Sequence, residues 1–245
     1  MMQPFSALVL IPFSVAASAC QQQVDVVAIA EAKTSATVPT ADNPIVVELY
    51  QSQGCSSCPP ANAAVNAIAD QPGIIALSFA VTYWDRLGWK DIFADKAYTQ
   101  RQYDYAHALG NANVATPQII INGKSAITGI KPGELAKSIA ASQPVSNGPS
   151  IEIKKDKVTV GKGSGSANVW LVRYDPRTQN VAIRSGENDG RTLPHKNIVR
   201  SLVKLGEWKG MATTFKLPEA RPSPLNAVIL VQRTGARAII AAKKV

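Results

Sequence analysis

The fold of this 245-residue chain is decided by residues 45–60, which read Ile-Val-Val-Glu-Leu-Tyr-Gln-Ser-Gln-Gly-Cys-Ser-Ser-Cys-Pro-Pro. The apolar run at 45–49 is typical of a strand buried on both faces, and the alanine-rich residues 61–69 predict a helix. Cys55 and Cys58 are therefore expected at a helix N-terminus, where unpaired backbone N–H groups and the helix dipole stabilise a thiolate. Because Cys55 comes first, we expect it to be the more exposed and the more acidic thiol.

A Cys-x-x-Cys pair at such a turn has three chemical interpretations: a redox pair, half of a zinc site, or a disulfide that only staples the turn. A zinc site would need two further ligands, and the additional Cys and His residues of the chain are Cys20, His107 and His195, none at ligand spacing to another. The sequence favours the redox pair and assigns no metal site. The structural disulfide and the thiol metal site remain as alternatives.

Residues 1–19 resemble a secretory signal peptide. This segment has no charged residue, is apolar from Phe5 to Phe13, and ends in Ala-Ser-Ala before Cys20. We therefore expect export, to the periplasm or the periplasmic face of an envelope membrane. The same ending fits a lipoprotein signal, in which Cys20 would be lipidated, and both forms of signal remain open. Since no other stretch reaches the ~18 consecutive apolar residues of a membrane span, we expect no span.

Composition and periodicity divide the rest of the chain. Residues 20–43 are rich in Ala, Thr, Val and Gln and are expected to form a flexible tether. In residues 44–141 strands alternate with helices, and residues 142–150, Ser-Gln-Pro-Val-Ser-Asn-Gly-Pro-Ser, have the composition of a linker. The alternating part is expected to contain strands over 45–50, 74–81, 118–121 and 125–128, and helices over 60–69, 94–109 and 133–141.

Residues 151–245 show the short strands and frequent turns of a mainly antiparallel β-sandwich domain. The expected strands are 151–153, 158–160, 169–174, 181–184, 198–205, 213–217, 226–232 and 236–241. Asp189-Gly190 is a strong turn signal and predicts a hairpin.

Positive charge is concentrated in this second part of the chain. From residue 150 onward there are 18 Lys and Arg against 7 Asp and Glu, a net charge of +11, whereas residues 1–149 carry a net charge of −2. A basic surface attracts anions, and on an exported protein these would be anionic lipid, an envelope polymer or an acidic protein rather than nucleic acid. The alternative is a basic surface that serves solubility alone.

The order strand-helix-strand-helix-strand-strand-helix, with Cys-x-x-Cys at the first strand-to-helix turn, is similar to the thioredoxin fold. Thr116 and Pro117 immediately precede the strand at 118–121, and Asn-Gly at 122–123 then predicts a hairpin turn. The resemblance implies that Pro117 is a cis-proline that faces the cysteine pair, beside backbone N–H and C=O groups that would bind a substrate strand. An ordinary trans-proline that starts a strand is the alternative.

Two further stretches resemble one family more closely. Tyr-Trp-Asp-x-Leu-Gly-Trp-x-Asp-x-Phe at 83–93 is followed by Thr-Gln-Arg-Gln at 99–102, and Gly-Glu-Asn-x-Gly-Arg-Thr-Leu-x-His-x-Asn stands at 186–197. Together they are similar to the bacterial exported family catalogued as domain of unknown function 1223, which is assigned a thioredoxin-like core. The resemblance covers about residues 46–231. The biochemical role of that family is undefined, so the resemblance implies fold rather than function.

The tryptophan-containing stretch carries one departure from the family and one candidate role. Members usually have His-Val-Asp before the Tyr-Trp pair, whereas this chain has Ala-Val-Thr at 80–82, so any help that those side chains give to thiol proton transfer is missing here. Trp84 and Trp89 are expected to form a cap packed beside the cysteine turn, or alternatively an aromatic rim for a substrate.

The sequence thus predicts an α/β thioredoxin-like domain followed by a basic β-sandwich domain, in an exported thiol–disulfide oxidoreductase. Cys55 would be the attacking thiolate and Cys58 the resolving thiol, while Thr116, Pro117 and Trp84 would line the groove for a protein thiol or disulfide substrate. This chemistry implies no organic cofactor. The alternatives are a non-enzymatic envelope binding module with a structural disulfide, and a thiol metal-binding protein.

Overall fold

Residues 1–2, 38–219 and 224–245 are described by the computed structural model of this chain. The expected signal peptide, most of the expected tether and Cys20 lie outside these residues. Within the described residues, no helix is both long enough and apolar enough to cross a membrane. The elements below all belong to the unit formed by residues 36–245.

The first half of this unit alternates strands and helices, as the sequence predicts. Its elements are β1 (Ile45–Gln51), α1 (Pro59–Ile68), β2 (Ile74–Ala80), the 3-10 helix η1 (Asp85–Leu87), α2 (Lys96–Ala108), β3 (Gln118–Ile121), β4 (Ser125–Thr128) and α3 (Glu134–Ala141). β1 pairs parallel with β2 and antiparallel with β3, and β3 pairs antiparallel with β4. Every residue of β1 and β2 is buried, which explains their continuous apolar sequences.

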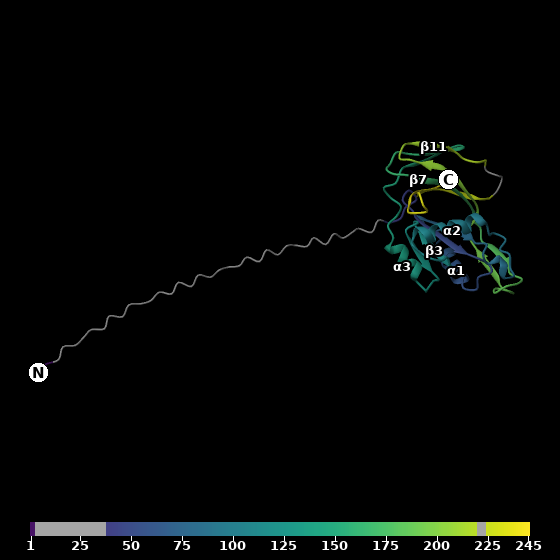
Figure 1. Cartoon of the computed structure of the whole chain (residues 1–245), viewed down its shortest axis with the longest axis horizontal. Coiled ribbons are helices and arrows are strands. Elements are labelled where there is room, and N and C mark those ends of the chain that lie inside the picture. Colours follow the sequence, from purple (N-terminus) through teal and green to yellow (C-terminus); the bar gives the residue numbers. More distant parts are fainter. Residues whose placement is uncertain (3–37, 220–223) are drawn as a thin grey trace. The chain divides into compact units, whose positions relative to one another are not determined.

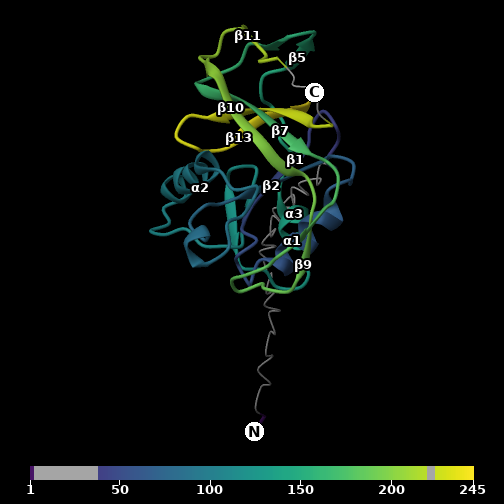
Figure 2. The ribbon, with the colours of Figure 1, turned by 90° about the vertical axis from the view of Figure 1, so that its right-hand side faces the viewer.

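Helices cover both faces of this part of the sheet (Figure 2). α2 packs on one face, where Tyr98 and Tyr105 join a core with Tyr50 and Phe79. α1 and α3 pack on the other face, against the side chains of β1 that alternate in direction with Tyr50. α1 starts with two prolines, whose fixed φ suits the first turn of a helix, and continues mainly in alanine.

The second half consists of strands. They are β5 (Ile151–Lys154), β6 (Lys157–Val160), β7 (Ala167–Asp175), β8 (Gln179–Ala182), β9 (Thr192–His195), β10 (Ile198–Trp208), β11 (Thr213–Lys216), β12 (Asn226–Arg233) and β13 (Ile239–Lys244). β7 pairs antiparallel with both β10 and β12, and β12 with β13. β11, β6 and β5 form a three-stranded sheet whose apolar side chains share a core with those of β7 and β12. β8 and β9 form a separate hairpin.

The two halves share one mixed sheet, with the strand order β13-β12-β7-β10-β2-β1-β3-β4. In Figure 1, β7 of the second half lies above β3, α1, α2 and α3 of the first half. The connection is a short parallel contact between β2 and β10, in which Ser78 is the register partner of Ile198. The Ser78 N–H donates to the Asn197 carbonyl at 3.0 Å, and the Asn197 side-chain amide donates to the Ala76 carbonyl at 2.9 Å. The architecture is therefore mostly β, with strands from both sides of the expected linker at 142–150 in a single sheet.

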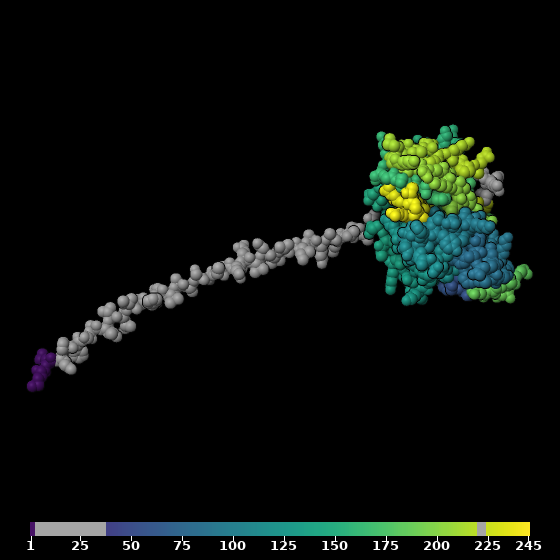
Figure 3. All heavy atoms as spheres, in the orientation of Figure 1, coloured from purple at the N-terminus to yellow at the C-terminus, as the bar shows by residue number. Residues whose placement is uncertain are grey.

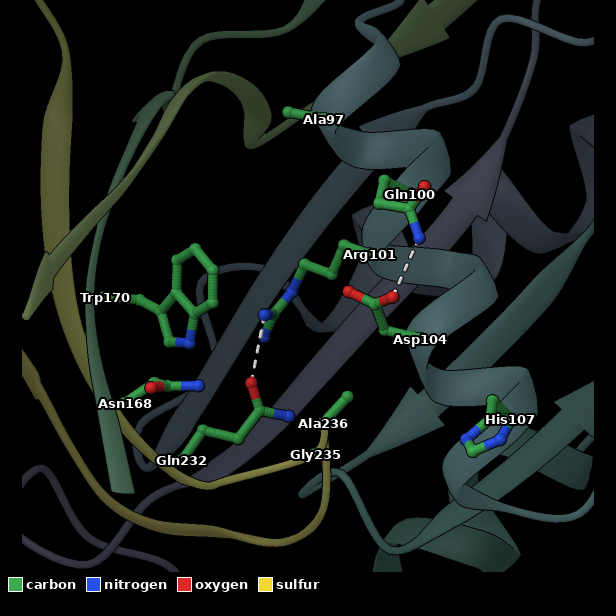
Figure 4. Close-up of a pocket in the computed structure, with 10 residues that line it drawn as sticks. All are labelled: Ala97, Gln100, Arg101, Asp104, His107, Asn168, Trp170, Gln232, Gly235 and Ala236. Carbon is green, nitrogen blue, oxygen red and sulfur yellow. Dashed lines mark hydrogen bonds between the residues drawn. The ribbon is translucent and has the colours of Figure 1, made fainter. Parts of the chain in front are cut away.

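A buried polar network adds a second joint between the halves (Figure 4). Arg101 of α2 donates to Glu48 of β1 at 2.8 Å and to Gln232 of β12 at 3.0 Å. Tyr105 donates its hydroxyl proton to the second oxygen of Glu48. Arg101 and Gln232 of this network also line a cavity of about 490 Å³, together with other residues of α2, Trp170 and the β12–β13 turn.

Each strand and helix that the sequence predicts is present, and its ends differ by at most three residues from the expected ones. The sequence does not predict η1 or β9. Residues 192–195 include a proline, which cannot donate to a sheet ladder and therefore argues against a strand in the sequence. The structure nevertheless forms β9 there, with a buried histidine at its end.

Candidate functional site

The candidate site is the turn between β1 and α1, residues 52–58, which we call the disulfide turn. Cys55 and Cys58 form a disulfide, and Cys58 is the N-cap residue of α1. The turn is closed by two backbone hydrogen bonds, from the Cys55 N–H to the Ser52 carbonyl at 3.1 Å and from the Cys58 N–H to the Cys55 carbonyl at 3.2 Å. The sequence therefore places the pair correctly at a strand-to-helix turn.

The helix N-terminus offers fewer backbone donors than the sequence argument assumes. Pro59 and Pro60 occupy the first two helical positions, and proline has no N–H group. The hydroxyl oxygen of Ser57 lies 3.3 Å from the sulfur of Cys55, so its one proton can be donated either to a thiolate there or to the carbonyl of Thr116.

Both cysteines are completely buried, with 0% of each exposed to solvent. The expectation that Cys55 is the more exposed thiol is therefore wrong for this structure. The physical reason is that three segments distant in sequence lie against the disulfide turn and form hydrogen bonds with it.

The first of these segments contains Thr116 and Pro117, which lie in the short loop before β3. The peptide bond between them is cis. The Ser57 hydroxyl donates to the Thr116 carbonyl at 3.3 Å, and the indole N–H of Trp84 donates to the Thr116 hydroxyl at 2.7 Å. The structure thus brings together the disulfide turn, Thr116 and Trp84, three features that the sequence predicts for one groove.

The second segment, residues 83–91, forms hydrogen bonds with Gln53 of the disulfide turn. The indole N–H of Trp89 donates to the Gln53 side-chain oxygen at 2.9 Å, and one Asp91 oxygen accepts the Gln53 backbone N–H at 2.8 Å. Asp91 is buried, and this burial raises its pKa to about 6, against the opposing effect of hydrogen bonds from the Gln53 and Phe93 N–H groups. The segment therefore fixes the backbone two residues before Cys55.

The third segment is residues 185–191, in the connection between β8 and β9, which we call the covering loop. Asn188 of this loop is completely buried. Its side-chain amide donates to the carbonyl of Gln53 at 2.8 Å and to the carbonyl of Cys55 at 2.9 Å. One side chain from the second half of the chain therefore binds two carbonyls of the disulfide turn.

Glu187 provides a second contact from the same loop. One oxygen of its carboxylate accepts the backbone N–H of Ser56 at 3.0 Å. Hydrogen bonds from the side chain and the backbone of Ser56 lower the pKa of Glu187, so this carboxylate is ionised at neutral pH and contacts the residue that follows Cys55.

The covering loop has one hydrogen bond within itself and one to the segment at residues 83–91. Arg191 donates to the side-chain oxygen of Asn188 at 2.7 Å, and the Ser185 hydroxyl donates to the Gly88 carbonyl. In Figure 3 the green residues of the β8–β9 hairpin lie beside the blue residues of the early chain, at the lower edge of the molecule. The sequence predicts the hairpin turn but not its contact with the cysteines. The motif at residues 186–197 is the feature of the sequence that could have indicated this contact.

His195 is a buried histidine on the strand that follows the covering loop. It is completely buried, and its ring packs edge-on against Phe93 with 6.1 Å between ring centroids. Neither ring nitrogen has a hydrogen-bond partner among the described residues. Burial lowers the pKa of His195 to about 4, so the ring is neutral at physiological pH.

A metal centre and a ligand cavity are two other kinds of site that bear on the residues that the structure describes. No group of three or more His, Cys, Asp or Glu side chains there is placed to hold a metal ion. The cavity of about 490 Å³ beside α2 (Figure 4) is lined by polar residues, but it shares none of them with the disulfide turn.

Comparison with known proteins shows clear relatives. A family model described as "Protein of unknown function (DUF1223)" matches residues 46–232. The crystal structure of protein AGR_C_4864 from Agrobacterium tumefaciens is 31% identical, covers 86% of this chain and 96% of its own, and has a TM-score of 0.69. HBP35 of Porphyromonas gingivalis is 14% identical, covers 85% of this chain and 76% of its own, and has a TM-score of 0.54, which shows a likeness of fold alone. None of the curated proteins that were searched matches the chain.

Proposed function

Because the chain belongs to the DUF1223 family of proteins of unknown function, we propose its activity from its own residues: it is a thiol–disulfide oxidoreductase. The observation that carries this proposal is the disulfide at the start of α1 between Cys55 and Cys58, which lie on one turn with two residues between them. A disulfide of this spacing can open and close without separating distant parts of the chain, because both sulfurs belong to the same short turn.

In the reductive direction, the Cys55 thiolate attacks one sulfur of a substrate disulfide. The substrate S–S bond breaks, the attacked sulfur stays bonded to Cys55, and the other substrate sulfur leaves as a thiolate that takes up a proton. The Cys58 thiolate then attacks the Cys55 sulfur, which releases the second substrate thiolate and restores the Cys55–Cys58 bond. Two electrons pass to the substrate, and a partner dithiol returns the pair to its reduced state. The same steps in reverse oxidise a substrate, and the reduction potential decides the direction.

The substrate would lie between the disulfide turn and the loop before β3. The Thr116–Pro117 peptide is tied to the turn through Ser57, and Trp84 donates to Thr116. We propose that the first half of the unit is thioredoxin-like, since the strands β2-β1-β3-β4 are adjacent and helices cover both faces. On this proposal Pro117 and Thr116 bind the backbone of an extended substrate, and Trp84 is the aromatic rim.

Titration against redox buffers tests this function. The folded protein is incubated in glutathione buffers of graded potential, free thiols are alkylated, and the mass shift is measured. We expect a reversible two-electron transition, and we expect Cys55 of a Cys58→Ser protein to be alkylated in the folded state. If the disulfide is reduced only when the protein unfolds, the pair is structural and the proposal fails.

The complete burial of both cysteines supports one alternative, a structural disulfide in a non-enzymatic envelope module. Structural disulfides resist reduction by the glutathione pool, whereas exposed or strained ones do not. The titration described above separates the two, because only the structural role requires unfolding before reduction.

We also propose that the protein is exported, on the evidence of the signal-like residues 1–19 and the cysteine usage. Mass spectrometry of the N-terminus in the native host tests this. Processing after Ala19 indicates secretion, a lipid-modified Cys20 indicates an anchored form, and an intact Met1 excludes both.

A further inference from the structure

The covering loop contacts the atoms that would control the reactivity of Cys55. Asn188 binds the carbonyl of Cys55 itself, and Glu187 binds the N–H of the next residue, Ser56. These residues come from the second half of the chain, 133 positions beyond Cys55 in the case of Asn188. A loop that only closed a hairpin would need neither contact.

The Glu187 contact affects the ionisation of Cys55 in two ways. Backbone N–H groups at the start of a helix favour a thiolate, but the Ser56 N–H is already bound to the Glu187 carboxylate. The Cys58 N–H is bound within the turn, and Pro59 and Pro60 have none. An ionised carboxylate that is hydrogen-bonded to the residue after Cys55 also opposes a negative charge on the Cys55 side chain, since like charges at short range repel. Both effects disfavour the Cys55 thiolate while the loop is in place.

From these contacts, and resting on the proposed redox function, we infer that the covering loop regulates the cysteine pair, with Glu187 and Asn188 as positioning residues. Asn188 holds the disulfide turn in its buried state, and Glu187 makes Cys55 less acidic. When the loop is lifted, the sulfurs become accessible and the Ser56 N–H is released. A substrate polypeptide would then take the place of the loop and its hydrogen bonds to the Gln53 and Cys55 carbonyls.

Two measurements on full-length variants test this inference. For Asn188→Ala we expect the rate of reduction by dithiothreitol to rise roughly tenfold, the effect of about 1.4 kcal/mol of lost hydrogen bonding. Arg191→Met should give a smaller rise, because it frees the Asn188 side chain without removing it. Asn180→Ala is the matched control, since this exposed asparagine lies on β8 of the same hairpin and its side chain forms no hydrogen bond with the disulfide turn.

The acidity of Cys55 is measured in the reduced Cys58→Ser background, from alkylation rate against pH. Glu187→Gln should lower the thiol pKa and raise the thiolate fraction at pH 7 roughly threefold, the order expected when one solvent-screened charge near the thiol is removed. Asp189→Asn removes the same charge from the same loop without a contact to the turn, and should have a smaller effect. Glu187 is exposed, so this variant tests the inference even if Asn188→Ala fails to fold.

The outcomes also separate this inference from the proposed function. If the wild-type disulfide is reversibly reducible but Glu187→Gln and Asn188→Ala leave both rate and thiol pKa unchanged, the covering loop has no regulatory role and the oxidoreductase proposal stands. If the disulfide of the wild type and of all variants opens only on unfolding, both fail. Faster reduction together with a lower pKa supports the inference.

Discussion

His195 shows how one buried side chain makes stability depend on pH. Its ring is neutral in the folded protein down to about pH 4, whereas an unfolded histidine takes up a proton near pH 6.5. Between these values the unfolded state binds more protons, so stability is fully present above about 6.5 and falls as the pH drops toward 4. Neither ring nitrogen has a hydrogen-bond partner among the described residues, so a charged ring would be buried without compensation.

We predict that His195→Leu removes this dependence. The free energy of unfolding of the wild type, relative to the variant, should fall by roughly 3 kcal/mol between pH 7 and pH 4, about 1.36 kcal/mol for each unit of pKa shift. Urea unfolding of both proteins at several pH values measures this. Asp91, whose pKa is raised by burial, is present in both proteins, so its titration cancels in the difference. A difference that is constant with pH would show that the pKa of His195 is the same in the folded and the unfolded chain.

Arg101 and Glu48 form an ion pair of which 4% and 0%, respectively, is exposed. We predict that Arg101→Met destabilises the protein by roughly 3–5 kcal/mol, because it leaves the Glu48 charge buried without its partner. The double variant with Glu48→Gln should be less destabilised than the sum of the two single changes. Urea unfolding of all four proteins gives the coupling energy, and additive effects would contradict the pairing.

At the scale of residues, the sequence identifies the groups that lie within a local motif. Cys55, Cys58, Thr116 and Trp84 are adjacent to recognisable turns or strand starts, and hydrogen bonds link their segments in the structure. Asn188 could not be assigned from its neighbours, because its role depends on a contact with a turn far earlier in the chain. Local pattern carries no information about such a contact.

At the scale of elements, the hairpin between β3 and β4 has a role beyond its own turn. The side-chain oxygen of Asn122 accepts the Val46 N–H at 2.7 Å. The backbone carbonyl of Asn122 accepts the Ile239 N–H of β13 at 2.9 Å. Gly123 is in the left-handed region with φ of 64°, and a Cβ atom there would lie 2.6 Å from the carbonyl oxygen of Arg237. The turn thus contacts β1 and the end of the chain at once.

We predict that Gly123→Ala destabilises the protein more than Gly129→Ala. Both glycines have positive φ, 64° and 69°, so both changes incur the cost of about 1–2 kcal/mol for a left-handed residue. Only at Gly123 would the added carbon also collide with backbone, whereas nothing lies within 4 Å at Gly129. Thermal unfolding of the two variants measures the difference. Equal losses would mean that the β12–β13 turn moves away without cost.

The elements themselves were predictable because strong periodicity is local. β3 and β4 have the predicted bounds, and α1 is displaced by one residue. What the sequence could not predict was the pairing between β2 and β10, since strand partners far apart in sequence leave no local pattern. A linker composition at 142–150 therefore indicated two domains, although the strands on its two sides complete one sheet.

At the scale of the whole molecule, the net charge of +11 after residue 149 remains without a partner of known identity. Lys154, Lys155 and Lys157 lie exposed on the β5–β6 hairpin. We predict that the full chain binds anionic liposomes and that the binding weakens steeply with salt, because the Debye length falls from about 10 Å at 0.1 M to about 3 Å at 1 M.

Charge reversal locates the binding surface. Changing Lys154, Lys155 and Lys157 to Glu should reduce liposome sedimentation strongly, whereas the same change at Lys90, Lys124 and Lys131, which are exposed in the first half, should reduce it less. Equal reductions would indicate attraction by net charge alone. Salt-independent binding, or none at low salt, would leave the charge a role in solubility only.

The covering loop also has a consequence for the order of synthesis. The ribosome makes the disulfide turn well before residues 185–191, so a nascent chain presents an open Cys-x-x-Cys turn to its surroundings. The edge of β2 likewise has no neighbour until β10 is made, and an unpaired edge invites wrong pairing. Until residues 185–191 have been made and have folded, the cysteine pair therefore lacks the contacts of Asn188 and Glu187.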